Sequence, residues 1–181
     1  MIDLIPARDT MIDLLSQVAA DQFAHATPCS EYTVADLIDH VDGVSVGFAA
    51  LARGDELPDA SAPSTAAPDW RDSVTKHVWA LGEAWADPTA WQGSTDAGGL
   101  ELPNELWGKI ALTELVVHGW DLAKATGQPF ELAEPTVLAC FEHVARFVPN
   151  APVEGLWAPA VRVPRDAALL DRLVAITGRN P

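Results

Sequence analysis

Apolar residues recur at helical spacing along most of the chain, and this pattern predicts a succession of amphipathic helices. The pattern is clear after Thr33, which is placed as an N-cap with Asp36 three residues later, and the helix that follows is expected to end near Gly54. The other predicted helices span residues 9–23, 69–85, 106–125, 135–148 and 166–178. Such a series of helices predicts an antiparallel bundle.

Residue types that favour helix boundaries stand at the expected places: Asn104 as a cap, Gly127 as a stop and Pro135 in a first turn. Segments 55–68 and 87–103 are rich in small, polar and turn-forming residues and are predicted to be loops. Segment 150–164 is interrupted by prolines and is expected to be extended. No internal repeat or long flexible linker appears, so residues 1–181 are predicted to form a single domain.

Composition and charge narrow the classes of partner. The chain is 49% hydrophobic and 20% charged, which is typical of a folded globular protein. Its formal net charge of −15 would repel nucleic-acid phosphates and anionic lipid surfaces. No run of apolar residues is long enough for a membrane span, and the N-terminus lacks the pattern of a secretory signal. The two cysteines, Cys29 and Cys140, are too few for a disulfide framework and predict a cytoplasmic protein. The acidic charge predicts that it has no nucleic-acid or membrane partners.

The candidate catalytic and metal-binding residues concentrate on the predicted helix 106–125, which is apolar almost all round. Glu114, His118 and Asp121 nevertheless fall within an arc of about 60°. Burying carboxylates without partners costs several kcal/mol, and a shared metal ion is one way to offset that cost. The i, i+4 spacing lets Glu114 and His118 reach one ion, although the two side chains would also satisfy each other as a simple ion pair.

A third ligand would come from another helix, and His40 is the candidate. It lies beside the apolar stripe of its helix, near Gly43 and Gly47, which leave room for a ligand or for close helix packing. A hydrogen-bonded core histidine is the alternative. The remaining histidines are expected to have surface roles, namely His25, His77 and His143. Cys29 is interpreted as a small residue packed in a turn rather than as a reactive thiol.

Two motifs and a tail carry a resemblance to a known family. The motifs are Thr27-Pro-Cys-Ser-Glu-Tyr-Thr-Val-Ala-Asp-Leu-Ile-Asp-His-Val41 and Thr113-Glu-Leu-Val-Val-His-Gly-Trp-Asp-Leu-Ala-Lys-Ala-Thr-Gly-Gln128, and the tail is 161–181. Together they resemble the DinB/YfiT-like metalloenzyme family. The resemblance is strongest to its actinobacterial branch, which is related to the metal-binding domain of mycothiol-dependent maleylpyruvate isomerases.

The resemblance implies an all-α, DinB-like up-down-down-up four-helix bundle with an additional short C-terminal helix. It also implies a divalent metal, zinc or else nickel, held by His40, Glu114 and His118. Asp121 is then expected to lie outside the ligand shell and to orient a ligand imidazole or a metal-bound water. Three protein ligands leave a coordination position open, as in catalytic sites.

In the family, the open position is associated with a low-molecular-weight thiol, so the resemblance implies a mycothiol-dependent transferase or isomerase acting on a small electrophile. The isomerase has a separate C-terminal domain without an evident counterpart here, so maleylpyruvate isomerisation itself is not expected and the substrate stays open. Alternatives are a metal-dependent hydrolase, a metal- or small-molecule-binding module without turnover, and a structural hydrogen-bond network. Arg53, Lys109 and Arg162 are candidate anchors for a thiol carboxylate, and either a monomer or a homodimer is expected.

Overall fold

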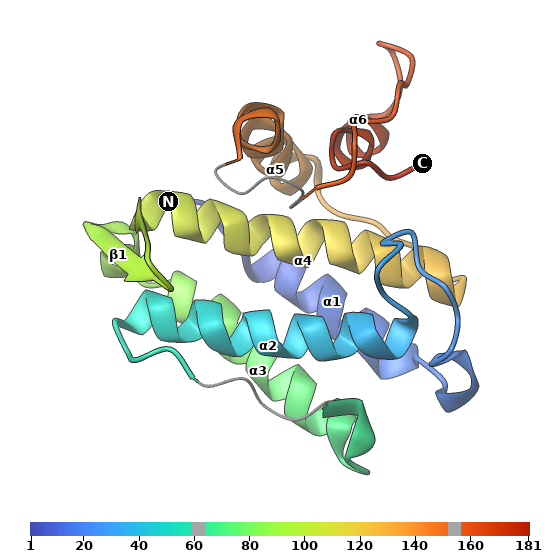
Figure 1. Ribbon diagram of the computed structural model, residues 1–181, viewed down its shortest axis with the longest axis horizontal. Coiled ribbons are helices and arrows are strands. Elements are labelled where there is room, and N and C mark those ends of the chain that lie inside the picture. The colour runs from blue at the N-terminus through green and yellow to red at the C-terminus, as the bar shows by residue number, and fades with distance from the viewer. Residues whose placement is uncertain (59–63, 152–156) are drawn as a thin grey trace. The chain divides into compact units, whose positions relative to one another are not determined.

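The computed structural model describes residues 1–58, 64–151 and 157–181, which divide into two compact units, 1–131 and 132–181. The first unit contains four long helices (Figure 1), namely α1 (Ile5–Gln17), α2 (Val34–Arg53), α3 (Trp70–Trp85) and α4 (Asn104–Thr126). Helix α2 packs between α3 and α4, and α1 packs against the same two helices. The single domain over residues 1–181 stays a prediction.

Side-chain contacts fix the direction of α1 relative to α3. Near the start of α1, the Arg8 guanidinium pairs with Glu83 at 2.7 Å, close to the end of α3. Near the end of α1, the Leu15 carbonyl accepts a hydrogen bond from Arg71, in the first turn of α3. The two helices are therefore antiparallel.

Helix α2 runs parallel to α3. Asp42 pairs with His77, and further along both helices the Trp85 indole donates to the Phe48 carbonyl at 3.0 Å. Because these contacts advance in the same direction, α2 and α3 point the same way, opposite to α1.

Helix α4 runs antiparallel to α2, because His40 contacts Glu114 while the later Phe48 packs on the earlier Trp107. The order is therefore up, down, down, up, which confirms the fold predicted from the sequence.

Several helix boundaries differ from the prediction. Helix α1 begins at Ile5 because Pro6 suits a first turn, and it ends at Gln17 because Val18 is extended, so the predicted span 9–23 was wrong. A separate 3₁₀ turn covers Ala20–Gln22. The predicted cap of α2 is confirmed, since Thr33 and Asp36 form a reciprocal capping box. Asn104 is the first residue of α4 rather than its cap.

The predicted loop 87–103 contains more structure than expected. A 3₁₀ turn, Pro88–Trp91, precedes an antiparallel hairpin of β1 (Ser94–Ala97) and β2 (Leu100–Pro103). Gly98 and Gly99 join the strands with φ angles of +64° and +88°, a backbone conformation that glycine adopts readily and that suits a two-residue hairpin turn. The all-α prediction therefore holds apart from this small sheet.

The second unit contains α5 (Glu134–Phe147), the 3₁₀ turn Val148–Asn150 and α6 (Leu169–Ile176), with α5 and α6 packed together. Pro135 lies in the first turn of α5, as predicted. Helix α6 begins at Leu169 rather than near 166. Of the predicted extended segment 150–164, residues 152–156 lie outside the described part, and the rest forms no strand. Across the described residues, no helix combines the length and apolar character that a membrane span requires.

Candidate metal centre

Helices α2 and α4 bring the three predicted ligands together. Nε2 of His40 lies 3.1 Å from Oε2 of Glu114, and Nε2 of His118 lies 3.2 Å from the same oxygen. The two imidazole rings meet edge to face with centroids 4.8 Å apart. Donor atoms bound to zinc at about 2.0–2.2 Å are separated by roughly 3.3 Å in a tetrahedral arrangement. The two nitrogen–oxygen distances thus lie close to the spacing that one divalent ion requires, and one ligand atom from each of the three residues lies within 4.8 Å of the other two.

The burial of the three side chains is graded. His118 and Glu114 project from the enclosed helix α4, with 6% and 14% of their side chains exposed, whereas 26% of His40 is exposed on α2. On α2, Gly43 and Gly47 follow His40 about one and two turns later, and a Cβ at either position would meet no atom of another part of the chain within 4 Å. The centre therefore has a closed side at α4 and open space beside His40, and the glycines do not serve close helix packing.

Burial and hydrogen bonding shift the pKa values of Glu114 and His118 in opposite directions. Burial raises the pKa of Glu114, but the bonds to His118 and His40 outweigh it and hold that pKa well below its usual range. Burial lowers the pKa of His118, but Asp121 and Glu114 outweigh it and raise the pKa to about 9. Without a metal, the ionised carboxylate of Glu114 therefore pairs with the protonated imidazole of His118. A metal ion would replace that proton.

Asp121 lies one turn beyond His118 and is completely buried. Its Oδ2 is 3.0 Å from Nδ1 of His118, the ring nitrogen that faces away from Glu114. This is the arrangement in which a carboxylate orients a metal-binding imidazole from outside the ligand shell. The placement agrees with the expectation for Asp121, and its role stays a prediction.

Tyr32 is a neighbour of the centre that the sequence reasoning did not single out. Its ring stacks on His40 with centroids 5.1 Å apart, and its hydroxyl lies 3.3 Å from Nδ1 of His40. Burial, followed by the nearby Cys29 and Glu114, raises the pKa of the phenol. Tyr32 thus lies at Nδ1 of His40, as Asp121 lies at Nδ1 of His118. Because Tyr32 is in a turn, the helical spacing of the sequence does not predict its position.

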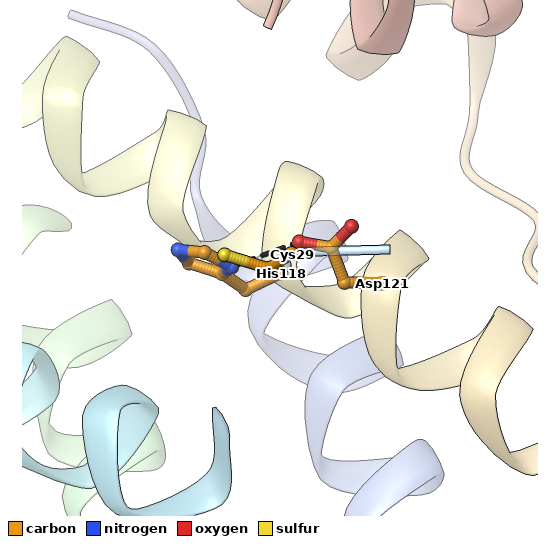
Figure 2. A group of neighbouring side chains, drawn as sticks. All are labelled: Cys29, His118 and Asp121. Carbon is orange, nitrogen blue, oxygen red and sulfur yellow. Dashed lines mark hydrogen bonds and ion pairs between the residues drawn. The ribbon is translucent and has the colours of Figure 1, made fainter. Parts of the chain in front are cut away.

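Cys29 also lies close to His118 and Asp121. Its sulfur, a nitrogen of His118 and a carboxylate oxygen of Asp121 all lie within 4.8 Å of one another (Figure 2). The sequence interpretation of Cys29 as a turn-packing residue therefore missed its proximity to ionisable groups.

Among the described residues, the other histidines belong to neither group of donors. His25 is exposed, as expected. His77 is half-buried and pairs with the buried Asp42 at 2.7 Å. His143 is buried and stacks on Phe147, so its predicted surface role was wrong.

Residues 4–123 match the family described as the mycothiol maleylpyruvate isomerase N-terminal domain. The match spans most of the first unit and includes His40, Glu114, His118 and Asp121. The chain belongs to this family. The resemblance found in the sequence motifs is thereby confirmed.

The chain is also similar to two proteins of Mycobacterium tuberculosis, the uncharacterized proteins Rv0738 and MT0763. Each is 30% identical over 177 residues, covering 96% of this chain and 94% of its own. The actinobacterial character of the branch is consistent with these relatives.

Among solved structures, the crystal structure of the mycothiol-dependent maleylpyruvate isomerase is similar, with a TM-score of 0.59 and 21% sequence identity. The similarity covers 78% of this chain and 66% of that one. At this level of identity the likeness concerns the fold, which the two proteins share.

Proposed function

We propose that this member of the mycothiol maleylpyruvate isomerase N-terminal domain family is a divalent-metal-dependent transferase or isomerase that uses a low-molecular-weight thiol, mycothiol, on a small electrophile. The observation that carries the proposal is the approach of His40, Glu114 and His118 to one point, with Glu114 Oε2 between the two Nε2 atoms. The family membership supports the thiol.

The chemistry of the donor set fits a metal ion. Two neutral imidazoles and one carboxylate leave a net charge of about +1 on a bound divalent ion, which favours an anionic fourth ligand such as a thiolate. Zinc is the expected ion and nickel the alternative, since both bind imidazole well. When bound, the ion would supply Lewis-acid chemistry that lowers the pKa of a thiol or of water.

The residues of this chain then have distinct tasks. His40, Glu114 and His118 hold the ion, and Asp121 fixes the imidazole of His118 through Nδ1. The open space beside Gly43 and Gly47 is the side from which we expect a small molecule to approach the ion. A reduced cytoplasm suits this chemistry, and Cys29 and Cys140 form no disulfide.

Lys109 and Arg53, two of the candidate anchors for the carboxylate of a thiol, lie in positions that do not favour this role. Lys109 pairs with Glu105, one turn earlier on α4. Arg53 lies 13 residues beyond His40 on α2, which is about 20 Å along the helix. Arg162 belongs to the second unit.

The proposal is tested by titrating cobalt-substituted Cys29→Ser protein with mycothiol. In this background, a sulfur-to-cobalt charge-transfer band reports the added thiol alone. We expect the band to appear, and to be absent from the Cys29→Ser/His40→Ala protein. An unchanged cobalt spectrum contradicts the thiol proposal.

A metal-dependent hydrolase is the rival activity, and the same protein distinguishes it. If thiols leave the cobalt spectrum unchanged while the loaded protein hydrolyses activated esters or amides, water rather than thiol is the activated group.

A further inference from the structure

A second set of donors lies beside the proposed centre and has a different chemistry. Cys29 comes from the turn before α2, whereas His118 and Asp121 come from α4. One donor atom from each lies within 4.8 Å of the other two (Figure 2). The set offers sulfur, nitrogen and oxygen, whereas the first set offers two nitrogens and one oxygen.

The two sets use opposite sides of one imidazole ring. Nε2 of His118 faces Glu114 at 3.2 Å, while Nδ1 faces Asp121 Oδ2 at 3.0 Å. The distance of 3.0 Å is close to the roughly 3.3 Å that separates two donors on one tetrahedral ion. An ion on the Asp121 side would thus take the place of a hydrogen bond without a large movement of either side chain.

The turn that carries Cys29 is held in place by its own hydrogen bonds. The Thr27 hydroxyl donates to the carbonyls of Cys29 and Tyr32, both at 2.9 Å, and the Tyr32 amide also donates to the Cys29 carbonyl. A backbone bridge between Ala26 and Thr33 closes the turn. The thiol is therefore presented to α4 from an ordered segment, and rotation about its side-chain bonds adjusts the sulfur.

We propose that Cys29, His118 and Asp121 form a second metal site, which takes a thiophilic divalent cation such as Cd²⁺. Thiolate sulfur selects soft ions, whereas the first set suits ions that prefer nitrogen and oxygen, such as Ni²⁺. The Cys29 thiol and the Nδ1–H group each release a proton to solvent as the ion binds. This site needs no contribution from His40 or Glu114, so it does not depend on the proposed function.

The test compares Cd²⁺ and Ni²⁺ binding by metal-free protein. Cd²⁺ is expected to produce a sulfur-to-cadmium charge-transfer band in the ultraviolet that is retained in His40→Ala and lost in Cys29→Ser. The matched control is Cys140→Ser, which alters the other cysteine and should keep the band. Asp121→Asn should weaken Cd²⁺ binding at least about tenfold.

Ni²⁺ should show the reverse dependence, with binding lost in His40→Ala and unchanged in Cys29→Ser. Far-UV circular dichroism of the metal-free variants checks the fold, and Cys29→Ala replaces Cys29→Ser if the latter does not fold. The proposal is overturned by a wild-type protein without the cadmium band, by a band that survives loss of Cys29, or by a band that requires His40. If Ni²⁺ binding survives in His40→Ala while the cadmium results hold, the first site fails and the second stands.

Discussion

Two histidine–carboxylate clusters lie on different sides of α2, and they are built differently. Toward α4, a single oxygen of Glu114 lies between the Nε2 atoms of His40 and His118. Toward α3, Asp42 divides its oxygens, with Oδ1 on His77 at 2.7 Å and Oδ2 accepting from Ser64 at 2.5 Å. Both carboxylates are largely buried, yet of these two clusters only the first gathers three potential metal ligands, two imidazoles and one carboxylate, around one point.

The difference shows how a metal centre is told apart from a structural network. Asp42 ties α3 and the turn Ser64–Ala66 to α2, and the neighbouring Asp39 reinforces the tie by accepting from the Thr65 amide at 2.8 Å. Each bond of Asp42 joins a different element, as expected of a residue that holds segments together. In the Glu114 cluster, by contrast, two imidazole nitrogens approach the same carboxylate oxygen.

The largest effect is expected from His118→Ala. Removing this donor leaves two protein ligands, and metal affinity should fall by more than about 100-fold, since losing an outer partner alone costs about 10- to 100-fold. Elemental analysis of purified protein measures the metal content. His77→Ala is the matched control from the Asp42 cluster and should keep full occupancy, whereas full occupancy in His118→Ala would contradict the site.

Asp121→Asn should weaken Ni²⁺ binding at the first site by about 10- to 100-fold, because the amide holds the His118 ring less firmly than a carboxylate does. Competition with a chelator measures the affinity. Asp42→Asn is the counterpart on the α3 side. It should leave metal affinity unchanged while lowering the free energy of unfolding by about 1–3 kcal/mol. Equal metal affinities for the two variants would remove the distinction between the clusters.

Metal-free protein should lose stability as the pH rises. The pKa of His118 is raised from 6.5 to about 9 by folding, so protonation stabilises the folded state. That stabilisation is complete below pH 6.5 and disappears as the pH passes through about 9. Urea unfolding with a chelator present, across this range, measures it. His118→Gln should flatten the profile while His77→Ala should not, and a flat wild-type profile would contradict the charged pair.

The smallest effect concerns the open side of the centre. Gly47→Ala should raise the free energy of unfolding by about 0.5–1 kcal/mol, because alanine suits a helix interior and its Cβ meets nothing within 4 Å. Gly108→Ala is the contrast, since its Cβ would lie 2.8 Å from the Trp91 ring and should destabilise the protein. Chemical denaturation compares them, and destabilisation by Gly47→Ala would show that the space is filled.

Periodicity predicted what lies on single helices. Glu114, His118 and Asp121 share one arc of α4, and the i, i+4 and i, i+3 contacts form as the spacing requires. His40 was selected from another helix, and the bundle brings it to within 3.1 Å of Glu114. The up-down-down-up order came from the family resemblance, because hydrophobic spacing alone does not distinguish parallel from antiparallel neighbours.

Residues outside the helices were not predictable in the same way. Tyr32 and Cys29 reach the centre because a turn folds back over α2, and no sequence period records that geometry. The Asp42–His77 pair joins residues 35 positions apart and depends on the parallel packing of α2 and α3. The hairpin did carry a signal, since Gly98-Gly99 stands between short alternating segments.

The parallel pairing of α2 and α3 sets a minimum length for the chain between them. Helix α2 ends at Arg53, whereas Ser64 bonds to Asp42, which lies 11 residues earlier on the helix, about 17 Å along its axis. A fully extended chain gains at most about 3.3–3.6 Å per residue, so at least five residues are needed. Deletions that leave fewer than about five residues between Arg53 and Ser64 would therefore pull Ser64 from its partner.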